Sequence, residues 1–441
     1  MPAAAGVRRS LAEWLAWQAA LHPVEIELGL ERCRQVAERL GLLHPHYTLI
    51  TVAGTNGKGS SVAMLDTTYR LAGYQVGTYT SPHLVRYNER IKLAGEAVDD
   101  ERICRAFAQV EAARGEIPLT IFEFGTLAAL VIFAEAAPQV AILEVGMGGR
   151  LDAVNILDAQ VALIATLDID HVEWLGHTRD AIAREKAGIL RRGRPAVCSD
   201  PAVPASLLDY ASAQAVPLAL LGVDYHFNDH GERWSWWSGA VLLSDLPRPA
   251  LSGTYQLRNA AGVLKVIDLL QSRHPVNPEQ IAAALHQVRL QGRFQRWLGP
   301  VELILDVAHN AQAVRAFAAN LDALPSATRT HVVLGMLRTK DRVAVMRTLD
   351  PRVDVWHLAT VDAARGACAA ELYETWRGLP RRRPAVCYES VAQAWHAART
   401  QAVAGERILV VGSFLTVGEV LRDLAAQSEL AALGAGTWTH S

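Results

Sequence analysis

The stretch TVAGTNGKGSSVAML, residues 51–65, decides the fold class, because it places glycines and a lysine between an apolar run and a helix-forming run. Phosphate-binding loops usually read glycine, four residues, then Gly-Lys-Ser/Thr. Here Val52 stands at the place of the first glycine, and Gly59 follows Lys58. The segment departs from the usual pattern but keeps a cation and a flexible backbone where a helix begins.

The loop has the groups that a phosphate cradle requires. Backbone N–H groups must converge on the anion, glycines must leave room for it, and a cation must stand at the helix terminus. The loop meets these needs with Gly54, Gly57, Gly59 and Lys58. Ser60 and Ser61 add hydroxyls, one of which could help to hold a metal ion. The alternative without function is a glycine-rich strand-to-helix turn with an exposed lysine.

Apolar runs of strand length alternate with helix-forming segments along the chain, which predicts an α/β protein with parallel sheets. The runs in the first part are YTLITV (47–52), QVGTYT (75–80), VAILEV (140–145), QVALIATL (160–167) and PAVC (195–198). Those in the second part are VELILDV (301–307), THVVLGML (330–337), DVWHLAT (354–360), AVCYE (385–389) and RILVVGS (407–413). The segment QGRFQRWLGP separates the two sets, which predicts one domain over residues 1–296 and a smaller, doubly wound, Rossmann-like domain over 297–441.

Three other stretches of the sequence predict local structure. Residues 225–246 alternate apolar and polar side chains, which predicts an antiparallel hairpin added to the first domain. The tail from Gln427 onward has the composition of a poorly ordered segment. The basic stretch RGLPRRRP, residues 377–384, is more typical of a solvated loop than of an anion-binding patch.

Composition restricts the class of protein. The 441-residue chain has a formal net charge of -2, which does not favour nucleic acid or an anionic membrane as a partner. No apolar run reaches the roughly 18 residues of a membrane span. Polar residues interrupt the apolar stretch at the N-terminus, whereas the apolar region of a signal peptide is uninterrupted. Five scattered cysteines without a CxxC pair are typical of a reducing compartment. We expect a soluble, cytoplasmic monomer without nucleic-acid or membrane partners.

Acidic residues and a histidine follow two of the predicted strands. Glu144 ends the run VAILE, and Asp168, Asp170 and His171 follow VALIATL. The carboxyl ends of parallel strands meet at one edge of the sheet, beside the Gly-Lys loop. Carboxylate and imidazole groups at that edge favour a metal-phosphate site. Either acidic segment alone is more typical of a helix cap or a solvated loop.

Eight segments extend this pattern along the chain: AGTNGKGSS, TSPHLVRYNERI, EVGMGGRLDAVN, DHVEWLG, REKAGI, QLRNA, QGRFQ and LDVAHN. Their order and context resemble the bacterial dihydrofolate synthase/folylpolyglutamate synthase family of the Mur ligase superfamily, from about Glu27 to Gly418. The loop alone is shared with other Mur-type ligases, whereas SPHL with NERI and GGRLDAVN with DHVEWLG point to the folate branch. The implied fold is a Mur-ligase-like P-loop ATPase domain with a central, mostly parallel sheet, followed by the Rossmann-like domain.

The resemblance implies an ATP-dependent ligase that forms an amide bond to L-glutamate. A carboxylate is a poor acyl donor because its leaving group would be oxide. The γ-phosphate of ATP converts the carboxylate into an acyl phosphate, which the glutamate amine can attack. In the family the substrate is dihydropteroate, which gives dihydrofolate, and in bifunctional members also reduced folates, whose γ-linked glutamate tail grows.

The resemblance also implies roles at matching positions. The expected ATP-binding residues are Thr55, Asn56, Gly57, Lys58, Gly59 and Ser60 in the loop, with Asn259, Arg293 and Asp306 further along the chain. Ser81, Glu144 and His171 match ligands of two Mg²⁺ ions, which would neutralise ATP and bridge the incoming carboxylate. Lys58 is expected to offset charge as the phosphoryl group moves. The nucleotide would lie between the two domains.

Two further residues have expected catalytic roles. Without the resemblance, Lys186 in REKAGI is a solvated helix lysine. The matching family lysine is carbamylated to N6-carboxylysine, an anion that contributes to the second metal site. That reaction needs a neutral amine, and therefore a lysine whose pKa is lowered by its surroundings. His309 in LDVAHN is a candidate base or phosphate contact, with helix capping as an equal alternative.

Three segments match the pterin-binding positions of the family. They are Ile26, Glu27, Leu28 and Gly29, then Thr120, Ile121, Phe122 and Glu123, and finally Leu151, Asp152 and Ala153. Phe122 offers a flat face for stacking, with core packing as the equal alternative, and Asp152 could read the amino and amide edge of the ring. Because the segments match the bifunctional pattern, we expect dihydropteroate to be accepted.

Three alternatives remain open. Within the ligases, the chain could lengthen folates without accepting dihydropteroate, or it could be a cell-wall amino-acid ligase. Outside the ligases, the loop could belong to a nucleotide-gated switch. A GTPase usually carries an Asn/Thr-Lys-x-Asp segment that reads the base, and in Thr339, Lys340 and Asp341 the aspartate comes one place early.

Overall fold

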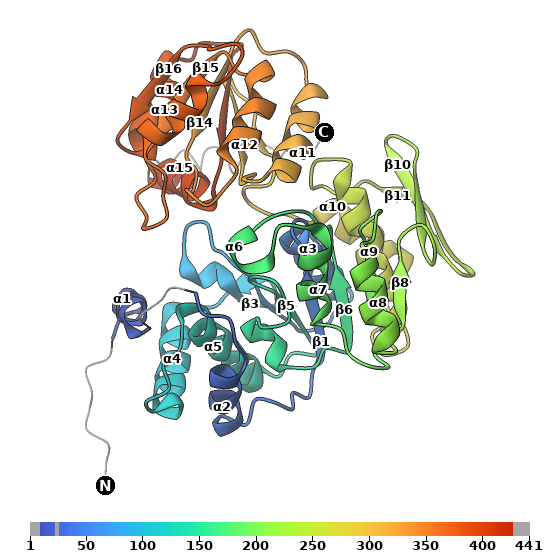
Figure 1. The fold of residues 1–441 in the computed structure, drawn as a ribbon. Coiled ribbons are helices and arrows are strands. Elements are labelled where there is room, and N and C mark those ends of the chain that lie inside the picture. Colours follow the sequence, from blue (N-terminus) through green and yellow to red (C-terminus); the bar gives the residue numbers. More distant parts are fainter. Residues whose placement is uncertain (1–8, 23–25, 427–441) are drawn as a thin grey trace.

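The computed structural model describes residues 9–22 and 26–426 and contains two sheets with helices on both faces (Figure 1). The predicted poorly ordered tail from Gln427 lies outside the described residues. An eight-stranded sheet forms the N-terminal unit and a six-stranded sheet forms the C-terminal unit, which confirms the predicted α/β class. A separate three-stranded sheet is attached to the N-terminal unit.

The N-terminal sheet has the strand order β4-β3-β2-β5-β1-β6-β7-β8. Its strands are β1 (Thr48–Ala53), β2 (Val76–Tyr79), β3 (Ile91–Leu93), β4 (Glu96–Ala97), β5 (Val140–Glu144), β6 (Val161–Ile164), β7 (Ala196–Cys198) and β8 (Leu218–Leu220). The strands from β2 to β8 in this order are parallel, and β3 and β4 add an antiparallel edge. The apolar runs around β1, β2, β5, β6 and β7 form these strands because helices cover both faces of the sheet and bury every residue of each strand.

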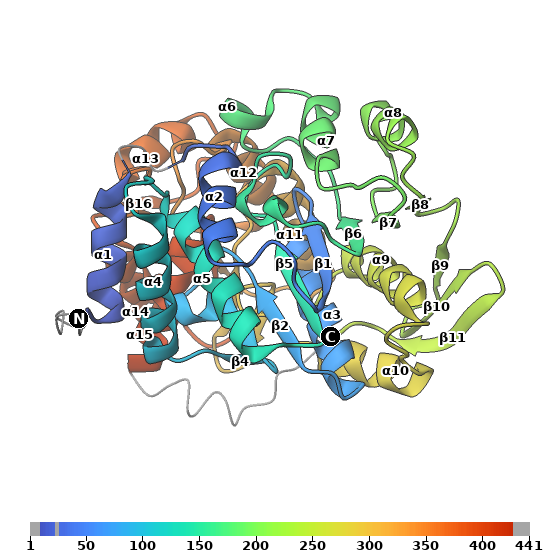
Figure 2. The ribbon, with the colours of Figure 1, turned by 90° about the horizontal axis from the view of Figure 1, so that it is seen from below.

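Two layers of helices enclose this sheet (Figure 2). One apolar core lies between the sheet and α1 (Leu11–Leu21), α2 (Glu31–Arg39), α4 (Asp100–Arg114), α5 (Ile121–Ala136), α7 (Arg179–Ala187) and α8 (Ala205–Ala213). The other lies under α3 (Lys58–Leu71), α9 (Tyr255–Leu270) and α10 (Pro278–Gln287). The short helices α6 (Val172–Leu175), η1 (Tyr87–Arg90) and η2 (Ala153–Ile156) lie in connecting segments.

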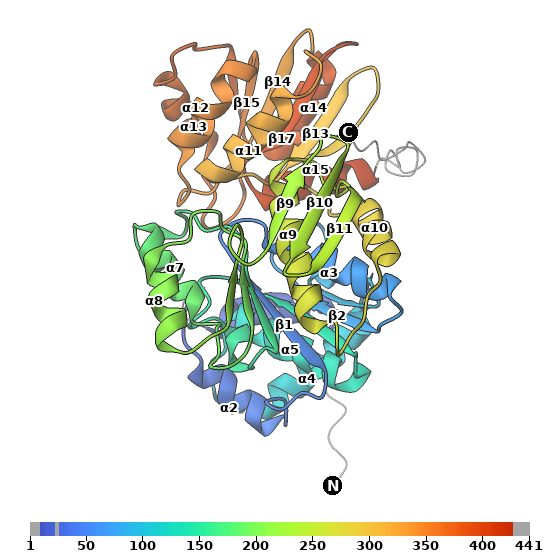
Figure 3. The ribbon, with the colours of Figure 1, turned by 90° about the vertical axis from the view of Figure 1, so that its right-hand side faces the viewer.

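The alternating stretch forms an antiparallel sheet, as predicted, but with three strands instead of two. These are β9 (His226–Asp229), β10 (Arg233–Ser238) and β11 (Val241–Pro247). The sheet lies beside α9 and α10 (Figure 3). Trp236 is buried there, and its indole N–H donates to the carbonyl of Ala261 at 3.1 Å. A buried indole with a satisfied N–H fixes this sheet on α9.

The C-terminal sheet has the order β12-β13-β17-β14-β15-β16, and only β12 is antiparallel to its neighbour. Its strands are β12 (Gln295–Trp297), β13 (Glu302–Asp306), β14 (Thr330–Leu334), β15 (Val355–Ala359), β16 (Ala385–Tyr388) and β17 (Arg407–Val411). Helices α11 (Ala311–Asp322), α12 (Arg342–Leu349) and α13 (Ala369–Arg377) cover one face, α14 (Val391–Gln401) and α15 (Phe414–Ala426) cover the other, and η3 (Asp350–Arg352) follows α12. Because β12 begins at Gln295, this sheet starts two residues before the predicted boundary at 297.

The two units meet at the carboxyl ends of their central strands (Figure 1). Asn56, in the loop after β1, donates to Asn310, in the segment after β13, at 3.3 Å. Asp170, after β6, contacts Lys340, after β14, at 2.6 Å. Ligands of open α/β sheets bind at this edge of the strands, so the contact zone between the units is the place to look for a site. Within the described residues no helix combines the length and apolarity of a membrane span.

Candidate active site

The Gly-Lys loop joins β1 to α3 and has little room for larger side chains. Gly57 has a φ of 86°, in the left-handed region that favours glycine. A Cβ atom at this position would lie 2.5 Å from Oδ1 of Asn259, so the amide of α9 closes directly onto the loop. Lys58 Nζ donates to the carbonyl of Gly54 at 3.0 Å, which holds its charge against the loop.

Glu144, Ser81 and Arg293 surround the start of α3. In the sheet Glu144 is the partner of Val52, immediately before the loop. A Cβ atom at Gly59 would lie 3.8 Å from both Glu144 Oε2 and Arg293 Nη2. Burial raises the pKa of Glu144, while the charges of Lys58 and Arg293 and the backbone N–H of Ser81 oppose that rise. The structure thus brings Glu144 and Arg293 to the start of α3 and Ser81 to Glu144, and their roles stay predictions.

The donor atoms around Glu144 fit a hard divalent cation. A serine hydroxyl and a carboxylate are ligands that Mg²⁺ prefers. Ser61 Oγ, in the first turn of α3, is buried without a hydrogen-bond partner and could supply another oxygen. His171 follows β6 and begins α6 with a φ of 51°. No group of three or more His, Cys, Asp or Glu side chains suited to a metal occurs within the described ranges, so the predicted ligand set stays a prediction.

Lys186 is a buried residue of the site and not a solvated helix lysine. It lies on α7, its exposed fraction is 3%, and its Nζ donates to the carbonyl of Gly54 at 2.9 Å. The same carbonyl accepts from Lys58. Burial and the nearby charge of Lys58 lower the pKa of Lys186 to about 7. The amine is therefore partly neutral near neutral pH, as the carbamylation prediction requires.

The other expected nucleotide contacts line the same zone. Asn259 donates to Gln256, whose amide donates to Ser60 Oγ at 3.2 Å, so α9 is connected to the first turn of α3. Arg293 lies 5.2 Å above the ring of Phe414. Asp306, at the end of β13, accepts from two backbone N–H groups, and burial raises its pKa to about 6. Thr55 Oγ1 donates to the carbonyl of Asp168 at 2.8 Å.

His309 does not cap α11, so that alternative is wrong. The cap is Asn310, whose side chain accepts from the backbone N–H of Ala313 at 2.9 Å. His309 Nδ1 lies 2.8 Å from the carbonyl of Val307, which can only accept, so Nδ1 carries the proton. The other ring nitrogen faces Asp170 Oδ2 at 3.5 Å. Burial lowers the pKa of His309, although Asp170 opposes the shift.

Sequence reasoning missed a polar network between the two units. Asp170 accepts from Lys340 at 2.6 Å and from Asn310 at 3.1 Å. Burial alone would raise the pKa of Asp170, but the bond from His309 and the charge of Lys340 hold it well below its usual range. Asn56 also bonds Gln312 on α11. The sequence links Lys340 only to an imperfect base-reading segment, but its place after the apolar run 330–337 is a signal that it lies at this edge of the sheet.

The predicted pterin segments lie close together in the N-terminal unit. The backbone N–H of Gly29 donates to the carbonyl of Leu151 at 3.2 Å, which joins the first segment to the third. Thr120 and Glu123 form a capping box at the start of α5, and this structural role accounts for their spacing. Arg32 joins Glu123 to the first segment, with an ion pair at 3.1 Å and another to Glu27.

Phe122 and Asp152 both have structural contacts that compete with their predicted roles. A Cβ atom at Gly146 would lie 2.6 Å from the ring of Phe122, so that residue must be glycine for the ring to pack there. Asp152 caps η2 and accepts from Val154 and Met147, and burial raises its pKa to about 6. The remaining apolar side chains of these segments form no hydrogen bonds; they are Ile26, Leu28, Ile121 and Ala153. The contacts of the three segments with a pterin therefore stay predictions.

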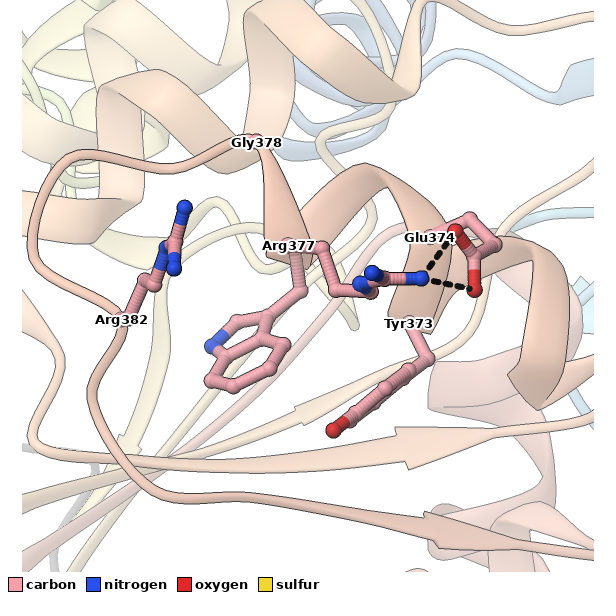
Figure 4. Close-up of a pocket in the computed structure, with 6 residues that line it drawn as sticks. Tyr373, Glu374, Arg377, Gly378 and Arg382 are labelled. Atoms are coloured by element: carbon pink, nitrogen blue, oxygen red, sulfur yellow. Dashed lines mark hydrogen bonds and ion pairs between the residues drawn. The ribbon is translucent and has the colours of Figure 1, made fainter.

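A hollow of about 530 Å³ lies at the end of α13 (Figure 4). Tyr373, Glu374, Trp376, Arg377, Gly378 and Arg382 line it. Arg377 pairs with Glu374 at 3.2 Å, and both side chains are mostly exposed. The hollow precedes β16, at the amino end of the sheet, whereas His309 and Lys340 follow the carboxyl ends of β13 and β14. The basic stretch is therefore a solvated loop, as predicted, and it lies away from the contact zone between the units.

Fold and site together define the class of protein. The family model described as "Mur ligase middle domain" matches residues 52–222, and that described as "Mur ligase, glutamate ligase domain" matches residues 292–414. The first range contains the Gly-Lys loop, Glu144, His171 and Lys186, and the second contains Arg293, His309 and Lys340. The structure is that of a Mur-type ligase, with a P-loop unit and a Rossmann-like unit facing each other across the site.

Whole-chain comparisons narrow the class. The chain is 40% identical over 417 residues to dihydrofolate synthase/folylpolyglutamate synthase of Escherichia coli, which covers 95% of this chain and 96% of that protein. The structure of E. coli FolC in complex with DHPP and ADP matches with a TM-score of 0.90 at 40% identity, covering 95% and 98% of the two chains. A bifunctional folylpolyglutamate synthase/dihydrofolate synthase with Mn, AMPPNP and L-glutamate bound matches with a TM-score of 0.87 at 42% identity and the same coverage. The chain belongs to the dihydrofolate synthase/folylpolyglutamate synthase family.

Proposed function

We propose that the chain joins L-glutamate to dihydropteroate and to reduced folates at one centre, between the Gly-Lys loop and the C-terminal unit. Membership of the family makes it an ATP-dependent ligase of folate metabolism. The observation that carries the residue assignment is the convergence of Lys58 and Lys186 on the carbonyl of Gly54, beside the start of α3. Lys58 thus brings a cation to the phosphate loop, and the buried amine of Lys186 lies against the same backbone carbonyl, within reach of the same site.

The residues of this centre can bind a polyphosphate from two sides. Lys58 approaches from the loop, and Arg293 approaches Gly59 from the C-terminal segment. The loop N–H groups and these cations offset charge that develops as the terminal phosphoryl group moves to the substrate carboxylate. Ser81, Glu144 and His171 would hold two Mg²⁺ ions, which supply further charge neutralisation when bound.

The chemistry then takes two steps that balance. A carboxylate oxygen of the pteroate or folate attacks the γ-phosphorus, and ADP leaves. The glutamate nitrogen attacks the resulting acyl carbonyl, loses a proton, and phosphate leaves with its oxygen. Burial lowers the pKa of His309, and its second ring nitrogen lies 3.5 Å from Asp170 Oδ2, a carboxylate that would stabilise the imidazolium, so we assign His309 as an acceptor of that proton.

Lys186 is the proposed site of carbamylation. Its amine would attack carbon dioxide, form an N–C bond and lose a proton, which leaves a carboxylate where there was a cation. A pKa of about 7 supports this step, because the attacking form is the neutral amine. NMR with ¹³C-labelled bicarbonate should show a carbamate carbon in the wild type and none in Lys186→Arg. If the two spectra agree, the assignment is wrong.

Closure of the two units would protect the acyl phosphate from water. The contacts of Asn56 and Asp170 with the C-terminal unit support closure as the state that assembles the site. Small-angle scattering should show compaction when a nonhydrolysable ATP analogue and dihydropteroate are added together. An unchanged radius of gyration would contradict closure.

The deciding experiment is a ligase assay with ATP, Mg²⁺, L-glutamate and either dihydropteroate or a tetrahydrofolate, with products identified by mass. Both products are expected. Turnover of tetrahydrofolate alone would favour the alternative of a folylpolyglutamate synthase without dihydropteroate activity. Glutamate-independent phosphate release would contradict ligase chemistry. The monomeric state and the cytoplasmic location stay predictions from the sequence.

A further inference from the structure

Asp170 belongs to the N-terminal unit, but most of its side-chain contacts come from the C-terminal unit. Lys340 Nζ donates to its Oδ1 at 2.6 Å, Asn310 Nδ2 donates to its Oδ2 at 3.1 Å, and His309 Nε2 lies 3.5 Å from Oδ2. The exposed side-chain fractions of Lys340 and Asp170 are only 7% and 10%. Separation of the units would leave this carboxylate without three neighbours.

The oxygen that Lys340 contacts also holds the backbone of the next residue. The N–H of His171 donates to Asp170 Oδ1 at 2.8 Å. His171 has a φ of 51°, a left-handed conformation that costs energy for a residue with a side chain and persists only where its surroundings impose it. Lys340 Nζ also lies 3.4 Å from His171 Nε2. The backbone of His171 is thus bonded to a carboxylate that also binds a lysine of the other unit, and the imidazole lies beside that lysine.

We propose that Lys340 is a positioning residue for the ligase reaction: it holds Asp170 from the C-terminal unit and, through Asp170, sets the backbone and imidazole of His171. This inference deepens the proposed function and rests on it for the role of His171 as a metal ligand. Association of the two units then completes the metal site, because Lys340 comes from the C-terminal unit and contacts both Asp170 and His171. The residue acts through its neighbours and needs no contact with substrate.

A neighbouring ion pair provides a matched control. Arg315, on α11, contacts Asp168 at 3.4 Å and also joins the two units. The exposed fraction of Arg315 is 62%, and exposed pairs of this kind have little effect. Arg315→Gln therefore removes a cation from the same interface without touching Asp170 or His171.

The test compares Lys340→Met, Lys340→Arg and Arg315→Gln with the wild type. Free Mn²⁺ is measured by electron paramagnetic resonance in the presence of a nonhydrolysable ATP analogue, and kcat and KM are measured in the ligase assay. We expect Lys340→Met to weaken Mn²⁺ binding and lower kcat by about 10–100-fold, the range for partners that orient metal ligands. KM for dihydropteroate should stay within about twofold, Lys340→Arg should recover most of the loss, and Arg315→Gln should match the wild type.

Two results would overturn the inference: Mn²⁺ binding by Lys340→Met that equals the wild type, or an equal loss in Arg315→Gln. If Lys340→Met does not fold, Asp170→Asn replaces it. It retains the size of the side chain and should weaken Mn²⁺ binding in the same way, and unchanged binding would again contradict the proposal. A wild type that binds Mn²⁺ but forms no folate product would refute the proposed function separately.

Discussion

The contact zone between the two units and the hollow at the end of α13 both contain arginines near aromatic rings, but different parts of the chain supply the cations. Arg293 lies 5.2 Å from the ring of Phe414 and reaches the Gly-Lys loop of the other unit. In the hollow, Arg377 and Arg382 come from one short stretch beside the stacked rings of Tyr373 and Trp376, 4.8 Å apart (Figure 4). Clustering of basic residues in the sequence is thus a weaker sign of a site than convergence of single cations from distant segments.

Among variants of the two regions, Lys58→Ala should cause the largest loss of activity. The variant removes a cation that is held against the phosphate loop at 3.0 Å from the carbonyl of Gly54. Loss of one such group from a phosphoryl-transfer site should lower kcat by about 10³-fold or more. Steady-state phosphate release with dihydropteroate and glutamate measures the effect, with thermal unfolding as the check on folding. A variant with kcat within tenfold of the wild type would remove Lys58 from the mechanism.

Arg293→Ala should have the next largest effect. The guanidinium approaches the loop from the C-terminal segment, and hydrogen bonds to charged groups contribute about 1.5–3 kcal/mol. We expect the Kd for ADP to rise by about 10–100-fold in calorimetry. Arg293→Lys keeps the charge and should lose less. Equal affinities for the wild type and Arg293→Ala would show that the two units do not share the nucleotide.

The lowered pKa of Lys186 predicts a pH dependence. Its amine is mostly neutral above its pKa of about 7 and mostly protonated below it. If carbamylation requires the neutral form, activity without added bicarbonate should fall about tenfold from pH 8 to pH 6, and bicarbonate should offset part of the fall. Lys186→Arg should be inactive over this range. A flat profile in the wild type would contradict a titrating amine.

Substitutions in the hollow at the end of α13 should have the smallest effect on kcat and KM. Arg377→Ala combined with Arg382→Ala removes two exposed cations that lie at the opposite edge of the C-terminal sheet from Lys340. Both kcat and the KM for each substrate should stay within about twofold, as for solvated surface charges. A larger change in any of these constants would make the hollow part of the reaction site and reverse the comparison.

Most long strands could be predicted because buried parallel strands have continuous apolar runs. The short strands β3, β4 and β12 have two or three residues each and no such pattern, and they form through their neighbours in the sheets. The three-residue strand β8 does lie in a short apolar run, which was not predicted as a strand. The capping box of Thr120 and Glu123 was readable from its spacing, but the resemblance assigned both residues to the pterin instead.

The sequence by itself determined the Gly-Lys loop, the order of the strands along the chain and the resemblance that the comparisons confirmed. These features depend on residues close together in the chain or on motifs that keep their order. Only the tertiary structure decided that Lys186 is buried with a lowered pKa and that Lys340 holds Asp170 across 170 residues of sequence. Burial and long-range ion pairs depend on how two folded units pack, and no local pattern of residues specifies that packing.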